Sequence, residues 1–222
     1  MEGATFAPLA EAFGAKRKVI APDQRGHGFS DHATAYGRED YLRDLDALFD
    51  HLQVSEAALL GNSLGGVNAY QYAARHPERV SALIVEDIGV EIGDDIPPIQ
   101  HWAGTFATRE DLEARIGPRL APYLEDSFRH TAEGWRLAFE PAEMMLSQTH
   151  LKGNYWSDWL ATACPALVIR GSDSRVTTAE HIREMAERRP CTESITLSGG
   201  HVVHRDNPAA FAEAVDSFLQ AR

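Results

Sequence analysis

Residues 61–65 read Gly-Asn-Ser-Leu-Gly and place the hydroxyl of Ser63 between two glycines. An apolar run, residues 57–60, precedes this stretch, and a helix-like run, residues 67–74, follows it. A serine on a sharp turn between a strand and a helix can attack a carbonyl carbon, and glycines allow the tight turn. Free N–H groups at the start of the helix can stabilise the negative charge that develops on the attacked oxygen. The pattern predicts a nucleophile, Ser63, with the N–H of Leu64 as an oxyanion donor.

A serine hydroxyl needs an adjacent base, and that base needs an acid to orient it. His201 is the best candidate base, because it follows Ser198-Gly199-Gly200 in a loop between the last predicted strand and the last predicted helix. The alternative is a surface histidine without a role. His204 lies three residues further on, but no third ligand is near in sequence, so we expect no metal site.

The apolar periodicity predicts strands that alternate with helices. Strands are expected over residues 18–23, 56–60, 80–85, 166–170 and 194–197, and helices over residues 6–13, 39–52, 64–76, 178–188 and 208–219. This order indicates a parallel sheet, in which functional side chains gather at the carboxyl ends of the strands. The polar residues that follow a predicted strand, and so should meet at one edge, are Asp23, Ser63, Asp87, Asp173 and His201.

Residues 88–160 differ from the rest of the chain, because strand patterns give way to helical segments that contain all four tryptophans. We therefore expect a helical insertion, residues 88–160, in an α/β core formed by residues 1–87 and 161–222. The large apolar side chains either line a pocket over the sheet or form a small core of the insertion itself. They are Trp102, Phe106, Trp135, Phe139, Met144, Met145, Trp156 and Trp159.

The composition indicates a soluble globular protein of 222 residues with a net charge of −12. This charge argues against nucleic acid or an anionic membrane as a partner. Cys164 and Cys191 are the two cysteines, and we expect reduced thiols in a cytoplasmic protein, with a single disulfide as the alternative. No apolar run is long enough to span a membrane, and the first residues do not resemble a signal peptide.

Three segments resemble motifs of the α/β-hydrolase superfamily. Residues 23–31 (Asp-Gln-Arg-Gly-His-Gly-Phe-Ser-Asp) resemble its Asp-x-Arg-Gly-His-Gly-x-Ser loop, residues 61–66 its nucleophile elbow, and residues 199–201 its histidine loop. The resemblance covers nearly the whole chain except the insertion. It implies a mostly parallel sheet flanked by helices, a helical cap formed by the insertion, and catalysis without a metal or an organic cofactor. Arg25 and His27 are expected to brace loops rather than to catalyse.

The resemblance leaves the acid open between three residues. Many members carry it after the seventh strand as Gly-x-x-Asp, but here Ser174 occupies that position and Asp173 comes one residue early. Some small bacterial esterases instead place the acid after the sixth strand, about two dozen residues past the nucleophile, and have serine where Ser174 lies. Asp87 matches that position and is our first choice, followed by Asp173 and then Glu86. A helix N-cap is the alternative role for Asp87.

The chain departs from the superfamily at its N-terminal end. Members begin with strands that end in His-Gly, and the loop that follows supplies half of the oxyanion hole. Those strands have no counterpart here, so the resemblance implies an N-terminally truncated fold in which the N–H of Leu64 is the remaining donor. We expect poor folding, because the strand predicted over residues 18–23 would lose its neighbour in the sheet.

The predicted function is a serine hydrolase that acts on a small-molecule ester or a related acyl compound. One alternative is a carbon–carbon bond hydrolase, or a cofactor-free haloperoxidase-like enzyme, that uses the same three residues. The other is a catalytically inactive homologue that binds a ligand. Ser63 argues against dehalogenase and epoxide-hydrolase chemistry, because the resembling enzymes use aspartate at this position.

Overall fold

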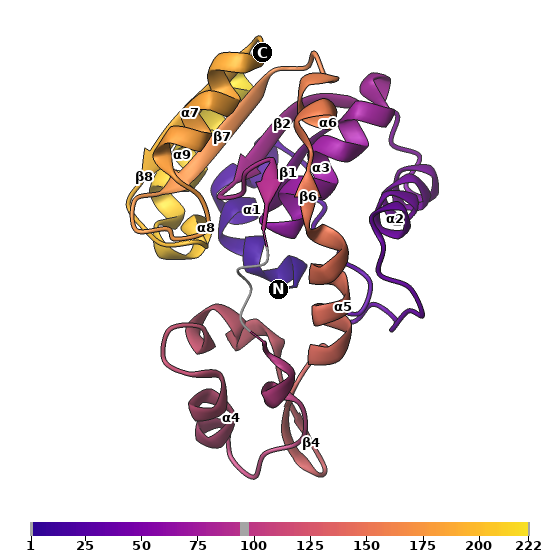
Figure 1. The fold of residues 1–222 in the computed structure, drawn as a ribbon, viewed down its shortest axis with the longest axis vertical. Coiled ribbons are helices and arrows are strands. Elements are labelled where there is room, and N and C mark those ends of the chain that lie inside the picture. The colour runs from indigo at the N-terminus through magenta and orange to yellow at the C-terminus, as the bar shows by residue number, and fades with distance from the viewer. Residues whose placement is uncertain (1, 94–97, 222) are drawn as a thin grey trace.

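A computed structural model describes residues 2–93 and 98–221 of the chain. Its main sheet has four parallel strands in the order β1-β2-β7-β8 (Figure 1). The strands are β1 (Ala57–Asn62), β2 (Val80–Glu86), β7 (Ala166–Gly171) and β8 (Thr192–Leu197). Four of the five predicted strands are therefore present, and the expected parallel sheet is confirmed.

The two central strands are apolar along almost their whole length because both faces of the sheet are covered. Six of the seven residues of β2 are buried, and five of the six residues of β7. The register pairs Gly61 with Val85 and Val85 with Val168, so the strands end side by side. The side chains that follow β1, β2 and β7 are consequently brought to the same edge.

Helices pack on both faces of this sheet. One face contacts α1 (Ala7–Phe13) and α9 (Pro208–Gln220) through a core that includes Phe13, Ile169 and Phe211. The other face contributes to the larger core, which contains residues of five helices. These helices are α2 (Arg38–His51), α3 (Leu64–Arg75), α5 (Pro141–Leu151), α6 (Trp156–Leu160) and α7 (Ala179–Arg188).

Short helices complete the core domain. They are η1 (Gly3–Phe6), η2 (Gly14–Lys16), η3 (Pro77–Arg79) and α8 (Val203–Asp206). Among the helices of the described residues, none has the length and apolar character needed to cross a bilayer.

The strand predicted over residues 18–23 is wrong. Among the described residues this segment has no strand partner, and β1 is the edge strand of the sheet. The apolar pattern reflects packing of Val19 against the α1–α9 core, whereas Ile20 is 42% exposed. The segment is held instead by Asp23, whose carboxylate accepts the N–H of Gly3 at 2.7 Å and that of Phe29 at 3.0 Å.

The described residues between 88 and 160 form strands as well as helices, which corrects the expectation of a purely helical insertion. An antiparallel hairpin joins β4 (Phe128–Thr131) to β5 (Gly134–Leu137), and β3 (Glu91–Ile92) pairs with β6 (Gly153–Asn154). Each of these strands has four residues or fewer, too short for periodicity to reveal. The helices are η4 (Gln100–Trp102), α4 (Arg109–Ile116), η5 (Ala121–Ser127) and α5 (Pro141–Leu151).

The large apolar side chains of the insertion divide between two cores. Trp102, Phe139 and their neighbours form a separate core, and the segment with α4 and β4 lies apart from the sheet in Figure 1. Trp156 and Trp159 instead belong to the main core beside α3, and Trp159 is fully buried. The insertion therefore has a small core of its own, as one of the two expectations had it, and this core includes Trp102 and Phe139. Trp156 and Trp159 are not part of it.

Candidate active site

Ser63 lies on a strained turn between β1 and α3. Its φ of 52° and ψ of −120° are unusual for a residue with a side chain. The turn requires glycine at Gly61, because a Cβ atom there would lie 2.1 Å from the carbonyl carbon of Gly65. The N–H of Ser63 donates to the carbonyl of Glu86 at 3.0 Å, which ties the turn to the end of β2. The sequence motif therefore forms the sharp elbow that exposes a hydroxyl.

The helix behind Ser63 supplies N–H groups at the same turn. The carbonyl of Ser63 accepts the N–H groups of Gly66 at 2.9 Å and Val67 at 3.2 Å. Leu64 is the first residue of α3, and the first N–H groups of a helix have no acceptor within the helix. The N–H of Leu64 is thus suited to a negatively charged oxygen beside the Ser63 hydroxyl.

Asp87 is buried directly after β2, and its carboxylate has three hydrogen-bonding neighbours. The N–H of Gly171 donates to Oδ1 at 3.1 Å, while the hydroxyl of Ser174 and Nδ1 of His201 contact Oδ2, the latter at 2.8 Å. Asp87 has no exposed surface, whereas the side chain of His201 is 30% exposed. With Nδ1 directed at the carboxylate, Nε2 of His201 is the nitrogen that remains for proton exchange.

The two other candidate acids lie elsewhere. Asp173 is exposed, and its backbone N–H donates to the carbonyl of Gly199 at 2.9 Å. Glu86 is buried and contacts Nδ1 of His204 at 2.7 Å. The structure therefore brings Asp87, rather than Asp173 or Glu86, to His201. Asp23, also expected at this edge, holds Gly3 and Phe29 instead.

Two residues hold the histidine loop in place, and neither was identified as functional from the sequence. The side-chain amide of Asn62 donates to the carbonyl of His201 at 2.9 Å, and the carboxylate of Asp206 accepts the N–H of Gly200 at 2.6 Å. Asn62 directly precedes Ser63, so one end of β1 carries the nucleophile and a contact to the histidine. Asn62 occupies the first x of the Gly-x-Ser-x-Gly motif, where any residue is allowed. A polar residue next to the nucleophile was the signal in the sequence that could have identified it.

His201 and His204 are three residues apart in sequence, but their side chains have different partners. The two rings contact different carboxylates, those of Asp87 and Glu86. The described residues hold no group of three or more histidine, cysteine, aspartate or glutamate side chains arranged for a metal ion. Cys164 and Cys191 are both free.

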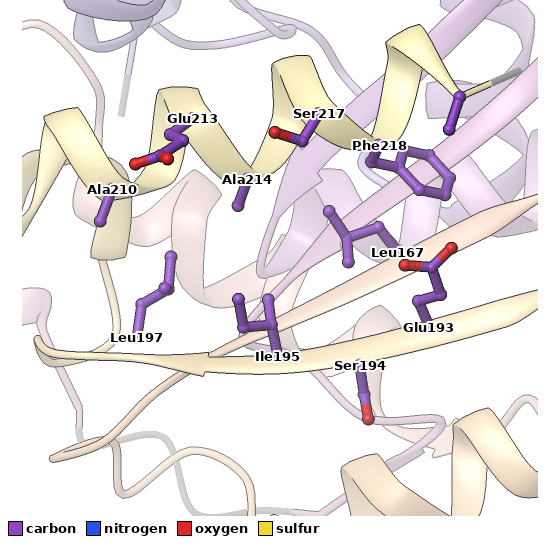
Figure 2. A pocket seen from close by; sticks show the side chains of 11 residues that line it. Leu167, Glu193, Ser194, Ile195, Leu197, Ala210, Glu213, Ala214, Ser217 and Phe218 are labelled. Carbon is purple, nitrogen blue, oxygen red and sulfur yellow. The ribbon is translucent and has the colours of Figure 1, made fainter.

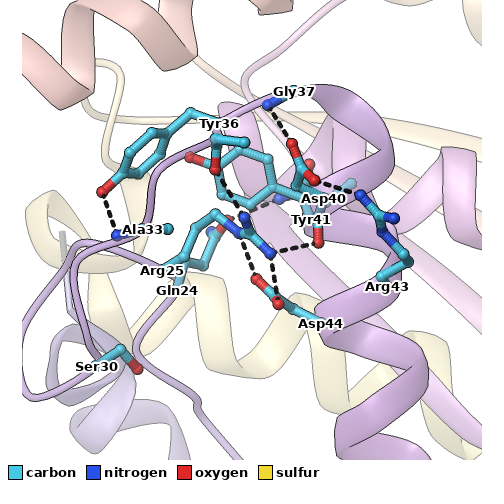
Figure 3. Close-up of polar contacts among 12 residues, drawn as sticks. Gln24, Arg25, Ser30, Ala33, Tyr36, Gly37, Asp40, Tyr41, Arg43 and Asp44 are labelled. Atoms are coloured by element: carbon cyan, nitrogen blue, oxygen red, sulfur yellow. Dashed lines mark hydrogen bonds and ion pairs between the residues drawn. The ribbon is translucent and has the colours of Figure 1, made fainter.

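Arg25 attaches its loop to α2 (Figure 3). Its guanidinium donates two hydrogen bonds of 2.7 Å to the carboxylate of Asp44 and others to the carbonyls of Ala35 and Asp40. The hydrogen bonds that Arg25 donates to Asp44 raise the pKa of Arg25, against an opposing effect of burial. The contacts are those of a structural brace, as the sequence reading expected.

His27, in the same loop, is buried beside Phe139 of the insertion, with ring centroids 5.8 Å apart. Burial lowers its pKa to about 4, so the ring is neutral at neutral pH. Its Nδ1 contacts the carbonyl of Arg25 at 3.0 Å, which completes the brace of this loop.

A cavity of about 490 Å³ lies between β8 and α9, away from Ser63. Figure 2 shows Ala210 and Ala214 of α9 opposite Ile195 and Leu197 of β8. Its lining includes none of Ser63, Asp87 and His201.

Known proteins resemble the chain over nearly its whole length. A family model described as "alpha/beta hydrolase fold" matches residues 2–208. The chain is 28% identical to 2-(acetamidomethylene)succinate hydrolase of Mesorhizobium japonicum, over 98% of this chain and 84% of that protein. It is 41% identical to 2-hydroxymuconate semialdehyde hydrolase of Pseudomonas sp. strain CF600, over 91% of this chain and 76% of that protein.

The architecture also matches a solved structure. The crystal structure of E-2-(acetamidomethylene)succinate hydrolase superposes with a TM-score of 0.88 at 25% identity, over 99% of this chain and 87% of that one. The parallel sheet, the elbow at Ser63 and these matches agree, and the chain belongs to the α/β-hydrolase family.

Proposed function

We propose that the protein is a serine hydrolase that cleaves a carboxylic ester or a related acyl compound. Ser63 attacks the carbonyl carbon, while Nε2 of His201 accepts the hydroxyl proton and later donates it to the leaving group. Asp87 orients His201, and the N–H of Leu64 stabilises the oxyanion. The observation that carries the proposal is the 2.8 Å contact between Nδ1 of His201 and a fully buried Asp87 at the strand edge that also presents Ser63.

We further propose that residues 88–160 act as a cap over this site. Support comes from α5 of the insertion, which contacts the loop between residue 23 and α2 of the core. Glu143 of α5 accepts the hydroxyl of Tyr36 at 2.6 Å and contacts Nδ1 of His32 at 2.8 Å. A cap attached in this way would exclude water from the acyl intermediate and shape the substrate pocket.

A fluorophosphonate probe tests the nucleophile directly, because it reacts with an activated serine irrespective of the natural substrate. We expect labelling of the wild-type protein at Ser63, identified by peptide mass spectrometry, and none of the Ser63→Ala variant. Ser217→Ala, at an exposed position of α9, is the matched control and should label normally. A folded wild-type protein that remains unlabelled would instead favour a ligand-binding homologue without activity.

A carbon–carbon bond hydrolase is the second candidate, favoured by two named relatives. The chain is 39% and 41% identical to 2-hydroxy-6-oxo-2,4-heptadienoate hydrolase and 2-hydroxymuconate semialdehyde hydrolase, both from Pseudomonas strains. A side-by-side assay of 4-nitrophenyl acetate and a 2-hydroxy-6-oxo-dienoate separates the two reactions. A kcat/KM for the dienoate that exceeds that for the ester by a hundredfold or so would replace ester hydrolysis as the conclusion.

A further inference from the structure

Two consecutive carboxylates at the end of β2 contact two histidines that are three residues apart. Asp87 contacts Nδ1 of His201 at 2.8 Å. Glu86 contacts His204 twice: Oε1 accepts its backbone N–H at 2.9 Å, and Oε2 contacts Nδ1 at 2.7 Å. The segment that carries the proposed base is therefore attached to the same strand end at two points.

The second pair is enclosed on every side that the structure describes. Glu86 is 0% exposed and His204 is 3% exposed. The His204 ring stacks on Phe6, with centroids 4.3 Å apart, and meets the edge of Phe211 at 5.8 Å. Its remaining nitrogen, Nε2, lies 3.0 Å from the hydroxyl of Thr5.

Thr5, His204 and Glu86 form a hydroxyl–imidazole–carboxylate series like that of a serine hydrolase. A second catalytic site is nevertheless excluded by burial, because Thr5 is only 5% exposed and its hydroxyl is already in contact with His204. A substrate carbonyl has no access to such a hydroxyl. Thr5, His204 and Glu86 can therefore influence catalysis only by holding neighbouring residues in place.

We propose that Glu86 and His204 are positioning residues that fix the loop bearing His201 beside the end of β1 that carries Ser63. This inference rests on the proposed function. His204 lies in α8, three residues after His201, and Glu86 holds both its backbone and its ring. A buried carboxylate with two hydrogen bonds forms a strong anchor, since leaving it unsatisfied is costly. Catalysis is sensitive to this anchor because a displacement of about 1 Å can cost a hundredfold in rate.

Glu86→Gln is the test variant, because it keeps the size of the side chain and removes the charge and one acceptor oxygen. With 4-nitrophenyl acetate we expect kcat to fall about tenfold or more while KM stays within about twofold. The second readout is the exchange of the His201 Nδ1 proton with water, followed by NMR in protein labelled with ¹⁵N-histidine. We expect this proton to exchange faster in the variant, because the ring spends less time on Asp87.

Thr162→Val is the matched control for a general loss of stability. Thr162 is buried, and its hydroxyl accepts a hydrogen bond from Nε of Arg189 at 2.9 Å. Thr162 precedes β7, so it lies near the amino ends of the strands, opposite the ends that carry Ser63 and Asp87. We expect a lower Tm with an unchanged kcat and unchanged proton exchange. If Glu86→Gln does not fold, Thr5→Val replaces it, with a smaller change in the same direction.

The two readouts separate failure of this inference from failure of the proposed function. If the wild-type protein hydrolyses no ester but Glu86→Gln accelerates exchange of the His201 proton, the positioning role stands and ester hydrolysis is wrong. If kcat and exchange in Glu86→Gln equal those of the wild type, or change no more than in Thr162→Val, the positioning role is overturned.

Discussion

The pairs Asp87–His201 and Glu86–His204 use the same chemical groups, contact distances within 0.1 Å of each other and neighbouring positions on the chain. They differ in their access to solvent. The side chain of His201 is 30% exposed, whereas that of His204 is 2% exposed and lies between two phenylalanines. A histidine–carboxylate pair is therefore available for chemistry only where one ring nitrogen remains accessible. We call Asp87–His201 the accessible pair and Glu86–His204 the sealed pair, whose role is to hold the fold around it.

The largest expected effect concerns the accessible pair. We predict that Asp87→Asn lowers kcat by about ten-thousandfold, because the orientation of His201 and the charge beside it are lost. The matched variant Asp173→Asn removes an exposed carboxylate at the same edge of the sheet and should leave kcat unchanged. Steady-state hydrolysis of an aryl ester measures both, and an equal loss in the two variants would end the distinction between these carboxylates.

The sealed pair should affect the stability of the protein as well as the position of His201. We predict that His204→Ala lowers the free energy of unfolding by about 3 kcal/mol, because it opens a cavity and leaves Glu86 without its ring partner. His201→Ala should cost much less, since Asp87 keeps Gly171 and Ser174 as partners and the lost ring is partly exposed. Urea denaturation followed by circular dichroism gives both values, and the comparison fails if they are equal.

A third histidine, His27, sharpens the comparison because it is buried and its Nδ1 contacts a backbone carbonyl, that of Arg25, rather than a carboxylate. Burial lowers its pKa from 6.5 to about 4, so the unfolded chain binds more protons than the folded one between these pH values. Stability should therefore fall as the pH drops from 6.5 to 4. We predict that His27→Asn removes up to about 3 kcal/mol of this loss.

Urea denaturation of both proteins at pH 7 and pH 4 provides the measurement for His27. The other titrating groups are common to wild type and variant, so the difference between the two pH-dependent losses isolates this ring. Parallel stability curves for the two proteins across this range would contradict a neutral, buried His27.

The smallest predicted effect concerns Ser174, whose hydroxyl shares Oδ2 of Asp87 with His201. Ser174→Ala should lower kcat by about tenfold and leave KM unchanged, because Asp87 loses one of the groups that hold its orientation. Ser172→Ala, at a neighbouring exposed position, is the control. A kcat that is unaltered in both variants would show that Gly171 and the rest of the turn suffice to orient Asp87.

The sequence allowed the sheet to be predicted where apolar runs were buried on both faces, as in β2 and β7. It failed for residues 18–23, because an apolar pattern records side-chain packing and a strand also needs a backbone partner. The hairpin β4–β5 was not predicted for another reason: its strands of four residues are too short to show an alternation of apolar and polar residues.

By itself the sequence determined the elbow at Ser63, because Gly-x-Ser-x-Gly between an apolar run and a helix is a local pattern set by steric limits on a tight turn. It also determined the order of the elements that carry Ser63, Asp87 and His201. Only the tertiary structure decided which carboxylate meets which histidine, because Glu86 and Asp87 are adjacent in sequence. Their partners depend on the side of β2 from which each side chain leaves and on the fold of the loop after β8.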